Sequence, residues 1–499
     1  MMQQRSLAVI LTAFSLLGRV SAAIGPKVSL PIVNAIIAPD GFNRSTEDDL
    51  GVTYSAVLAG GTFPGPLITA NKSDDFSINV MDQLKDNTMD LETSIHWHGI
   101  FQKTTNYADG GAFVNQCPIV PTESFLYQFN AEDQTGTYWY HSHFQAQYCD
   151  GLRGPLVIYD PKDPHASLYD VDNESTVITL GDWYHNVSAV TSQTLTHPFD
   201  SALINGKGRY PGGPQVPLAV VNVQRNRRHR LTVIEVDGNN VQPLVVDSLD
   251  IFAGIRSLPT RLPPPGTASF ANFTNVAILR YSGAPIQNPT TNPNASIPPS
   301  VLPLKETDLH PLVPTPVPGK PFPGGADINI NLNVLLDTSN IADEKSVLFY
   351  INNATFTSPK VPVLLQILSG AKSASELLPK GSVYGLERNM SVEISIPASD
   401  TAAPGGPHPV HLHGHAFHVV RSAGNATYNY NNPVIRDVVS MGNSGDNVTI
   451  RFFTDNPGPW FFHCHIDWHL ERGFAVVFAE DVYDVPTTDI VTGEARVYP

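Results

Sequence analysis

Histidines in a His-x-His spacing are the most informative feature of this 499-residue sequence. Residues i and i+2 of a β-strand point to the same face, so each such unit directs two imidazoles to one place. Imidazole binds copper, zinc, iron and nickel, and eight imidazoles exceed what one tetrahedral zinc needs. One unit alone could be an ordinary surface or core pair, but four units predict a cluster of several metal ions. The units are His96 with His98, His141 with His143, His411 with His413, and His463 with His465.

The four units form a distant internal repeat. The segment Ile95–Gly99 resembles Val410–Gly414, and Gly136–His143 resembles Gly458–His465. We therefore expect two related modules that each supply two units to one cluster at their interface. These modules flank a middle one, residues 160–318, whose sequence holds no His-x-His pair.

A second site is predicted around Cys464, which lies between His463 and His465 and so points to the opposite face of a strand. A thiolate with two histidines is the ligand set of an electron-transfer blue copper site, and His408 and His469 are available in the same module. The corresponding positions of the first module hold weaker ligands, which predicts one such site, in the last module only. Those positions are Thr93, Ser142 and Gln147.

A copper thiolate next in sequence to two cluster ligands provides a covalent electron route. The single-metal site would take electrons one at a time, and the cluster would store them for an acceptor such as dioxygen. Blue sites often carry an axial Met, but no Met follows Cys464, and Phe474 has no donor atom. We therefore expect a non-coordinating axial neighbour and a raised reduction potential.

Short strands are the elements that must position these ligands. The candidate strands are β-branched or aromatic and end at turn residues, and few long windows hold a helical period. This pattern predicts an all-β fold of antiparallel sandwiches. Module boundaries are expected in the Pro-rich stretch Pro311–Gly325 and near Asp160–Pro164. The clearest strands are Ser94–His98, Gly154–Tyr159, Ser175–Leu180, Leu218–Val223, Val363–Ile367, Val392–Ile396 and Phe474–Phe478.

Composition and the amino terminus predict an exported protein. Only 15% of the residues are charged, and the formal net charge of -16 disfavours nucleic acid and anionic lipid as partners. The segment Met1–Ala22 has a basic start, a short apolar run and small residues at its end, as a cleaved signal peptide does, and no further hydrophobic span predicts a membrane anchor. Ten Asn-x-Ser/Thr sequons predict glycosylation, at Asn43, Asn71, Asn173, Asn186, Asn272, Asn294, Asn353, Asn389, Asn425 and Asn447.

The histidine motifs resemble the four copper signatures of the multicopper oxidase family, most closely those of fungal laccases. The matching segments are His96–Gly99, Trp139–His143, His408–Gly414 and His463–His469. The resemblance implies a secreted, monomeric enzyme that oxidises phenols and aromatic amines by one electron and reduces dioxygen to water, with roles such as lignin degradation. It also implies three cupredoxin-like Greek-key β-sandwich domains, at residues 23–159, 160–318 and 319–499.

The same resemblance assigns ligands to four copper ions. The type 1 copper takes His408, Cys464 and His469, of which Cys464 and His469 carry the donor's electrons, and Phe474 and Ile466 lie beside it. The type 2 copper takes His96 and His411. The two type 3 coppers share His98, His141, His143, His413, His463 and His465.

Two acids also match laccase carboxylates near the oxygen site. These are Asp109, in a Tyr-Ala-Asp-Gly segment, and Asp437, which follows Arg436. Bound oxygen must receive protons, and a carboxylate is a suitable relay. A plain turn residue for the first and a surface ion pair for the second are equally good interpretations.

Departures from the laccase pattern fall on the cysteines and the middle module. The laccase cysteines at the positions of Cys117 and Cys149 form disulfides whose partners are missing here, so these two could bridge each other. A segment absent before Leu231 also carries the laccase acid that binds a phenol hydroxyl. Irregular stretches at Thr46–Gly60 and Gly254–Phe273 add to the difference. We expect native-like outer modules and a middle module that lacks strands.

Two alternatives stay open. Another specificity of the same family, such as metal-ion or ascorbate oxidation, has little support from the sequence, because neither neighbour of His469, Trp468 or Leu470, is acidic. A copper protein without turnover, or a splice or gene-model variant that misfolds, would also fit the shortened middle module.

Overall fold

The structure is a computed structural model, and it describes residues 23–44, 54–191, 199–223, 231–249, 274–290, 300–339, 347–399 and 407–485. The predicted signal peptide, the stretch Gly254–Phe273, the junction before Leu231 and the first part of Thr46–Gly60 lie outside these residues. The described chain is almost entirely β-structure, which confirms the all-β prediction. No helix within it is long and apolar enough to cross a membrane.

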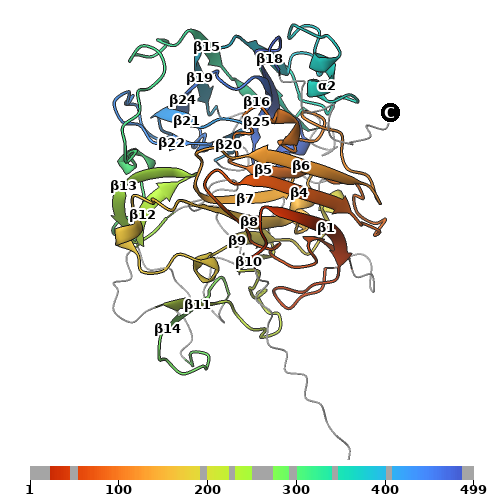
Figure 1. The fold of residues 1–499 in the computed structure, drawn as a ribbon, viewed down its shortest axis with the longest axis vertical. Helices are drawn as coiled ribbons and strands as arrows, with labels where there is room; N and C mark the ends of the chain where they lie inside the picture. Colours follow the sequence, from red (N-terminus) through yellow and green to blue (C-terminus); the bar gives the residue numbers. More distant parts are fainter. Residues whose placement is uncertain are drawn as a thin grey trace, which may run out of the picture.

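The first module is a sandwich of two four-stranded sheets (Figure 1). One sheet has the order β2 (Ala56–Ala59), β1 (Lys27–Ala35), β4 (Asp75–Asp82) and β6 (Ser124–Asn130). The other has the order β3 (Ile68–Asn71), β8 (Arg153–Tyr159), β7 (Gly136–Ser142) and β5 (Ile95–His98). Burial alternates along β4 because one face of the strand lies in the core. Phe76, Trp97 and Tyr127 fill the space between the sheets.

The third module is a larger sandwich of two five-stranded sheets. One has the order β15 (Ile328–Asn331), β19 (Ser391–Pro397), β24 (Asn447–Phe453), β21 (Phe417–Arg421) and β22 (Ile435–Arg436). The other has the order β18 (Val383–Leu386), β26 (Ala475–Glu480), β25 (Gly458–Cys464), β20 (Pro409–Leu412) and β23 (Val438–Ser440). The remaining elements are the hairpin β16 (Val334–Asp337) and β17 (Leu348–Ile351) and the short helices α2 (Val363–Leu368) and α3 (Asp467–Glu471).

The sequence pattern predicts antiparallel sandwiches, but the sheets of the outer modules are mixed. Each sheet of the outer modules contains one parallel pair, because a Greek-key chain that crosses between sheets can return in the same direction as its new neighbour. The parallel pairs are β1 with β4, β3 with β8, β15 with β19, and β18 with β26.

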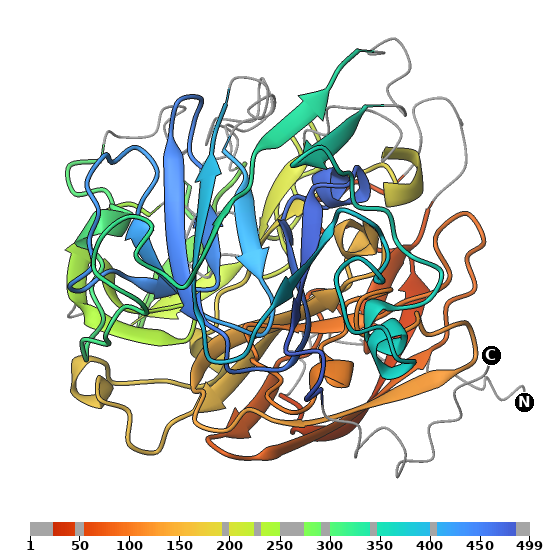
Figure 2. The ribbon, with the colours of Figure 1, turned by 90° about the horizontal axis from the view of Figure 1, so that it is seen from above.

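The middle module consists, in its described residues, of three two-stranded sheets and one short helix. Its apolar side chains join the cores of its neighbours: Trp183 packs with Leu58 of the first module, and Val236 and Val241 pack in the core of the third. The hairpin of β12 and β13 lies against the third module in both views (Figures 1 and 2). The elements are β9 (Leu180–Trp183) with β10 (Ser201–Ile204), β11 (Val220–Val223) with β14 (Ile278–Tyr281), β12 (Leu231–Val236) with β13 (Asn239–Val246), and α1 (Ser188–Thr191).

Two of the predicted strands are wrong. Val363–Ile367 lies in α2, where Val363, Leu364 and Ile367 face the core, a helical rather than a strand spacing. A short apolar run of this kind does not distinguish strand from helix by its pattern alone. In Ser175–Leu180, the Asn173 side chain accepts the Ser175 N–H and starts a single 3-10 turn, so the strand begins only at Leu180.

Candidate metal centre

Strand pairing brings the His-x-His units together within each outer module. In the first module β5 pairs with β7 so that His96 lies opposite His141. In the third module β20 pairs with β25 so that His411 lies opposite His463. The second histidine of most units lies just beyond the end of its strand. All eight histidines are buried, the most exposed being His143 at 6%.

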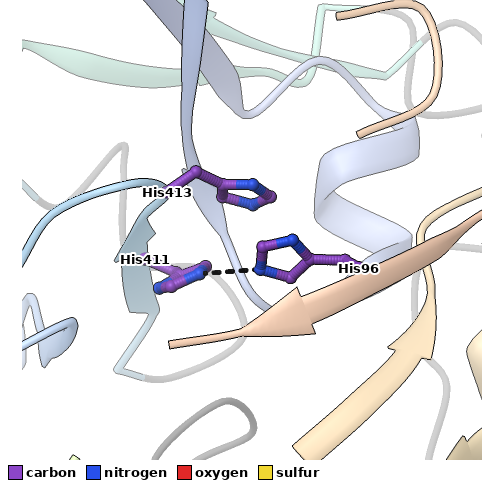
Figure 3. Close-up of side chains that lie close together, drawn as sticks. All are labelled: His96, His411 and His413. Carbon is purple, nitrogen blue, oxygen red and sulfur yellow. Dashed lines mark hydrogen bonds between the residues drawn. The ribbon is translucent and has the colours of Figure 1, made fainter. Parts of the chain in front are cut away.

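The two modules meet through these histidines. A dashed line in Figure 3 joins His96 Nε2 to His411 Nε2, which lie 3.4 Å apart. His143 Nε2 lies 3.3 Å from His463 Nε2. The rings of His96 and His413 are stacked with their centroids 3.9 Å apart. The structure therefore places the four units in one cluster at the interface of the first and third modules, where the repeat predicts it.

Hydrogen bonds orient the imidazoles with one nitrogen toward the cluster. His96 Nδ1 lies 2.7 Å from the carbonyl oxygen of Asp109, and His411 Nδ1 lies 2.8 Å from that of Asp437. A carbonyl oxygen only accepts, so each Nδ1 carries the proton and each Nε2 offers a lone pair. Holding a histidine through its second nitrogen is the usual way in which proteins orient metal ligands.

The imidazole nitrogens that point into the cluster are better suited to bind a cation than to hydrogen-bond to one another. His413 Nε2 and His463 Nε2 lie 3.0 Å apart, and both of their Nδ1 atoms already bond to oxygen acceptors. Among the described residues, His141 Nε2 and both ring nitrogens of His465 have no hydrogen-bond partner. Buried polar atoms without partners are rare, and metal ions between these nitrogens would satisfy them.

The protonation state suits metal binding as well. Burial lowers the pKa of His143 and of His465 to about 3. Burial, reinforced by the neighbouring histidines, also holds the pKa of His98 and of His411 well below its ordinary value. These side chains are therefore neutral at pH 7, which is the form that binds metals.

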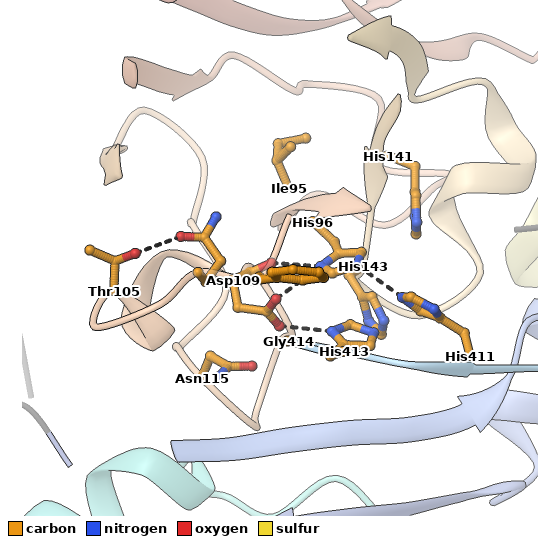
Figure 4. A network of polar contacts seen from close by, with 12 residues as sticks. Ile95, His96, Thr105, Asp109, Asn115, His141, His143, His411, His413 and Gly414 are labelled. Carbon is orange, nitrogen blue, oxygen red and sulfur yellow. Dashed lines mark hydrogen bonds and ion pairs between the residues drawn. The ribbon is translucent and has the colours of Figure 1, made fainter. Parts of the chain in front are cut away.

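Both acids singled out in the sequence lie at the cluster. Asp109 is fully buried, and its Oδ2 accepts from His413 Nδ1 at 2.7 Å (Figure 4). Gly110 has a φ of +89°, and a side chain there would overlap the carbonyl oxygen of Ile95. The Asp-Gly turn therefore lets the carboxylate approach the cluster closely.

Asp437 is 2% exposed, so the alternative of a surface ion pair is wrong. Its Oδ1 lies 3.5 Å from His98 Nε2, and its carbonyl oxygen accepts from His411. It stands between β22 and β23, which belong to different sheets of the third module. The acid is thus placed at a corner of the sandwich, where the chain passes from one sheet to the other.

The thiolate site lies on the other face of β25. Cys464 Sγ is 3.7 Å from His408 Nδ1 and 3.5 Å from His469 Nδ1, and the two nitrogens are 3.0 Å apart. The triangle is buried, with His469 at 9% its most exposed member. Helix α3 presents His469, whose N–H donates to the carbonyl oxygen of Ile466 at 2.8 Å. One sulfur and two nitrogens in this arrangement form the donor set of a trigonal copper site.

Aromatic side chains enclose the thiolate site. The Phe474 ring lies 5.3 Å from the His408 ring, and the Phe349 ring lies 5.0 Å from that of His469, measured between centroids. Phe474 is also tied to the site by its backbone, because its carbonyl oxygen accepts the Cys464 N–H at 3.0 Å. The sequence singled out Phe474 but gave no indication of Phe349.

In the first module, hydrogen-bonded side chains occupy the position equivalent to the thiolate site. Thr93 and Ser142 donate their hydroxyl groups to Gln147 Oε1, at 2.8 and 2.7 Å, and all three side chains are buried. The three residues that replace the thiolate and its two histidines thus meet in space. They form a satisfied polar contact, with only weak ligands for a soft metal.

The other two cysteines are free, so the disulfide between Cys117 and Cys149 that the sequence left open is wrong. Cys117 is exposed. Cys149 is buried, and its thiol lies 3.6 Å from Asp467 Oδ2, at the start of α3.

Asp237 is a buried acid that the sequence pattern did not reveal. It stands at the tip of the β12–β13 hairpin, and its Oδ2 accepts from Arg436 Nε at 2.9 Å. The Asp-Gly step between two apolar strands does predict a hairpin. No sequence pattern connects it with a partner almost two hundred residues away.

Comparison with known proteins agrees with this geometry. Multicopper oxidase family models match residues 43–163, 174–231 with 227–257, and 356–484. The chain is 54% identical to Laccase-2 of Trametes villosa and to Laccase-2 of Trametes versicolor, over 96% of this chain and 94% of each relative.

Two solved structures show the same overall arrangement. One is Fet3p, a multicopper oxidase that functions in iron import, with a TM-score of 0.74, 27% identity, and coverage of 93% of this chain and 92% of that one. The other is a laccase from Botrytis aclada, with a TM-score of 0.73, 28% identity, and coverage of 93% and 89%.

The chain therefore belongs to the multicopper oxidase family. Its similarity over nearly the whole length to the Trametes laccases makes it an oxidoreductase of the laccase type, built from cupredoxin-like domains.

Proposed function

We propose that the chain oxidises small phenols and aromatic amines by one electron at the Cys464 site and delivers the electrons to dioxygen at the histidine cluster. The observation that carries this proposal is the position of Cys464. Its sulfur completes a buried triangle with His408 and His469, while its sequence neighbours His463 and His465 belong to the cluster. One strand thus serves both sites.

Four coppers would occupy these ligands when bound, and they would supply one-electron redox chemistry at one site and multi-electron storage at the other. His408, Cys464 and His469 would hold the type 1 ion. His96 and His411, whose Nε2 atoms face each other, would hold the type 2 ion. The type 3 pair would be shared by His98, His141, His143, His413, His463 and His465.

The chain's own groups set the electron route. The two peptide units that flank Cys464 join the thiolate to His463 and His465. A hydrogen bond from His463 Nδ1 to the carbonyl oxygen of Cys464, at 3.0 Å, adds a second connection. His469 is the most exposed of the three type 1 ligands and is the natural point of entry for an electron from a donor.

Protons would reach the cluster through Asp109 and Asp437. Each carboxylate is buried and lies beside a cluster histidine. A carboxylate that gives up a proton when oxygen is reduced must be recharged from water, so we expect the two acids to act as relays rather than as single-use donors.

We further infer that the protein is secreted and acts as a monomer, with domains at 23–159, 160–318 and 319–499. The predicted signal peptide and sequons support export. The Trametes laccase relatives support phenolic donors and dioxygen as the small-molecule partners, and supply no reason to favour metal ions or ascorbate.

Donor turnover by two cysteine variants tests the proposal. Cys464→Ser should abolish both the blue absorption and the oxidation of phenols, because the electron entry is lost. Cys117→Ser is the matched control, since that cysteine is exposed and lies outside both sites, and it should keep both properties. Phenol oxidation that survives Cys464→Ser would contradict the assignment.

A further inference from the structure

We propose that Asp237 of the middle module is a positioning residue for the metal cluster, acting through Asp437. This inference rests on the proposed function, because it concerns the histidines assigned to the type 2 and type 3 coppers. It also gives the shortened middle module a role in the reaction.

The hairpin tip that carries Asp237 is seated on the first module. The Thr137 N–H donates to Glu235 Oε1 at 3.0 Å, two residues before the tip. Gly238 has a φ of +72°, and a side chain there would overlap the Tyr138 ring. Asp237 has a φ of +49°, a conformation that Asp tolerates better than most residues. The turn is therefore shaped by contact with a neighbouring module.

The carboxylate of Asp237 is directed into the third module. It is 5% exposed, and its Oδ2 accepts from Arg436 Nε at 2.9 Å and from the Asp437 N–H at 3.4 Å. Arg436 also donates to Glu306 Oε1 at 3.1 Å. Breaking one partner of a buried ion pair is costly because the other charge remains buried.

Asp437 connects Asp237 to the cluster through its backbone and its side chain. Its N–H bonds to Asp237, and its carbonyl oxygen accepts from His411 Nδ1 at 2.8 Å and from the Leu412 N–H at 3.1 Å. Its carboxylate lies 3.5 Å from His98 Nε2. A shift of the Asp437 backbone would therefore move one cluster histidine and displace the acid beside another.

The first module holds its own acid differently. The N–H of Asp109 donates to the carbonyl oxygen of Asn106 at 3.2 Å, within a local 3-10 turn of the same module. Asp437 belongs to neither β22 nor β23, and the contact at its N–H comes from the middle module instead. The hairpin therefore binds the N–H of Asp437, whereas a local turn binds the N–H of Asp109.

The test compares Asp237→Asn with Glu306→Gln in the copper-loaded, full-length protein. Both variants remove one carboxylate from Arg436, but only the first weakens the acceptor of the Asp437 N–H, because a neutral amide oxygen accepts less strongly than a carboxylate. Replacing groups that orient metal ligands typically costs roughly 10–100-fold in metal affinity or activity. For Asp237→Asn we expect a loss of this size in kcat with an unchanged KM for the phenol.

Spectroscopy separates positioning from general destabilisation. Asp237→Asn should change the electron paramagnetic resonance signal of type 2 copper, or deplete that copper, while the type 1 signal and blue absorption stay as in the wild type. Glu306→Gln should leave both signals unchanged. An unaltered type 2 signal with unaltered kcat in Asp237→Asn would overturn the inference, and so would equal loss of both signals in the two variants.

Thermal unfolding of the metal-free variants adds a check that is independent of turnover. Both should lower the Tm, since each removes one of the two ion pairs that Arg436 forms. If the wild type itself shows no blue absorption and no turnover, the proposed function fails. If the wild type is active and Asp237→Asn equals it in every measurement, only the present inference fails.

Discussion

Asp109 and Asp437 occupy equivalent positions on the two halves of the metal centre. The carbonyl oxygen of each accepts a hydrogen bond from the first histidine of its own module's His-x-His strand. The carboxylate of each lies beside a histidine of the opposite module, at 2.7 Å for Asp109 and 3.5 Å for Asp437. The internal repeat therefore extends beyond the histidines to the acids around them, and each module places a carboxylate beside a histidine of the other.

Replacing Asp437 by Asn should slow the reduction of dioxygen by about 10²–10⁴-fold, the usual contribution of a positioned proton donor. Reduction of the type 1 site by a phenol should be unchanged, because that site lies on the other face of β25. Stopped-flow measurement of the two half-reactions separates these effects. Asp455→Asn, at an exposed ion pair with Lys103, is the control. Equal slowing of both half-reactions would argue against a proton relay.

Replacing Gly110 by Ala should destabilise the protein and disturb the type 2 copper. Gly445 has the same φ of +89° but nothing within 4 Å of an added Cβ, so Gly445→Ala measures the backbone strain alone, about 1–2 kcal/mol. The overlap with the Ile95 carbonyl should add about 1–3 kcal/mol for Gly110→Ala. Thermal unfolding and copper content check this. A Gly110→Ala protein as stable as Gly445→Ala would mean that the turn can move away freely.

Replacing Phe474 by Met should lower the reduction potential of the type 1 copper. Met would place beside the trigonal donor set a thioether that Phe lacks, and axial ligation tunes the potential of such sites. Redox titration followed by the blue absorption measures the change. Phe474→Leu is the matched control, because Leu is also apolar and non-coordinating, and it should stay close to the wild type. Similar shifts for Met and Leu would indicate altered packing rather than ligation.

Acid should destabilise the third module through His418. Burial lowers the pKa of His418 from 6.5 to about 4, so the unfolded chain binds the proton more tightly than the folded one. The stability contributed by the neutral, folded His418 is present above pH 6.5 and is lost as the pH falls toward 4. Between pH 7 and pH 4.5 this loss is about 2–3 kcal/mol. His418→Gln should show a smaller fall in Tm over this interval than the wild type. A fall of the same size in both would assign the acid sensitivity to other groups.

The histidine cluster was predictable because it follows from local spacing. A His-x-His unit on a strand needs no knowledge of the rest of the fold, and the repeat alone pairs the units of the two outer modules. The same reasoning locates the Cys464 site and the Thr93, Ser142 and Gln147 positions that replace it in the first module.

The contacts of the middle module were not predictable in this way. The role of Asp237 depends on a hairpin that docks between two modules and meets Arg436 far along the chain. The strand predicted at Val363–Ile367 was wrong for a different reason. The local pattern of this apolar run fits both a strand and a helix until the surrounding core selects one. Phe349 beside His469 has no local signal at all.

Elemental analysis of the purified, secreted protein tests the central claim most directly. The two sites predict four coppers per chain, with a blue absorption that accounts for one of them. Such a result would mean that both sites assemble despite the shortened middle module. Fewer than four coppers, with no blue absorption, would contradict the claim that Cys464 and the eight histidines form an electron-transfer pair of copper sites.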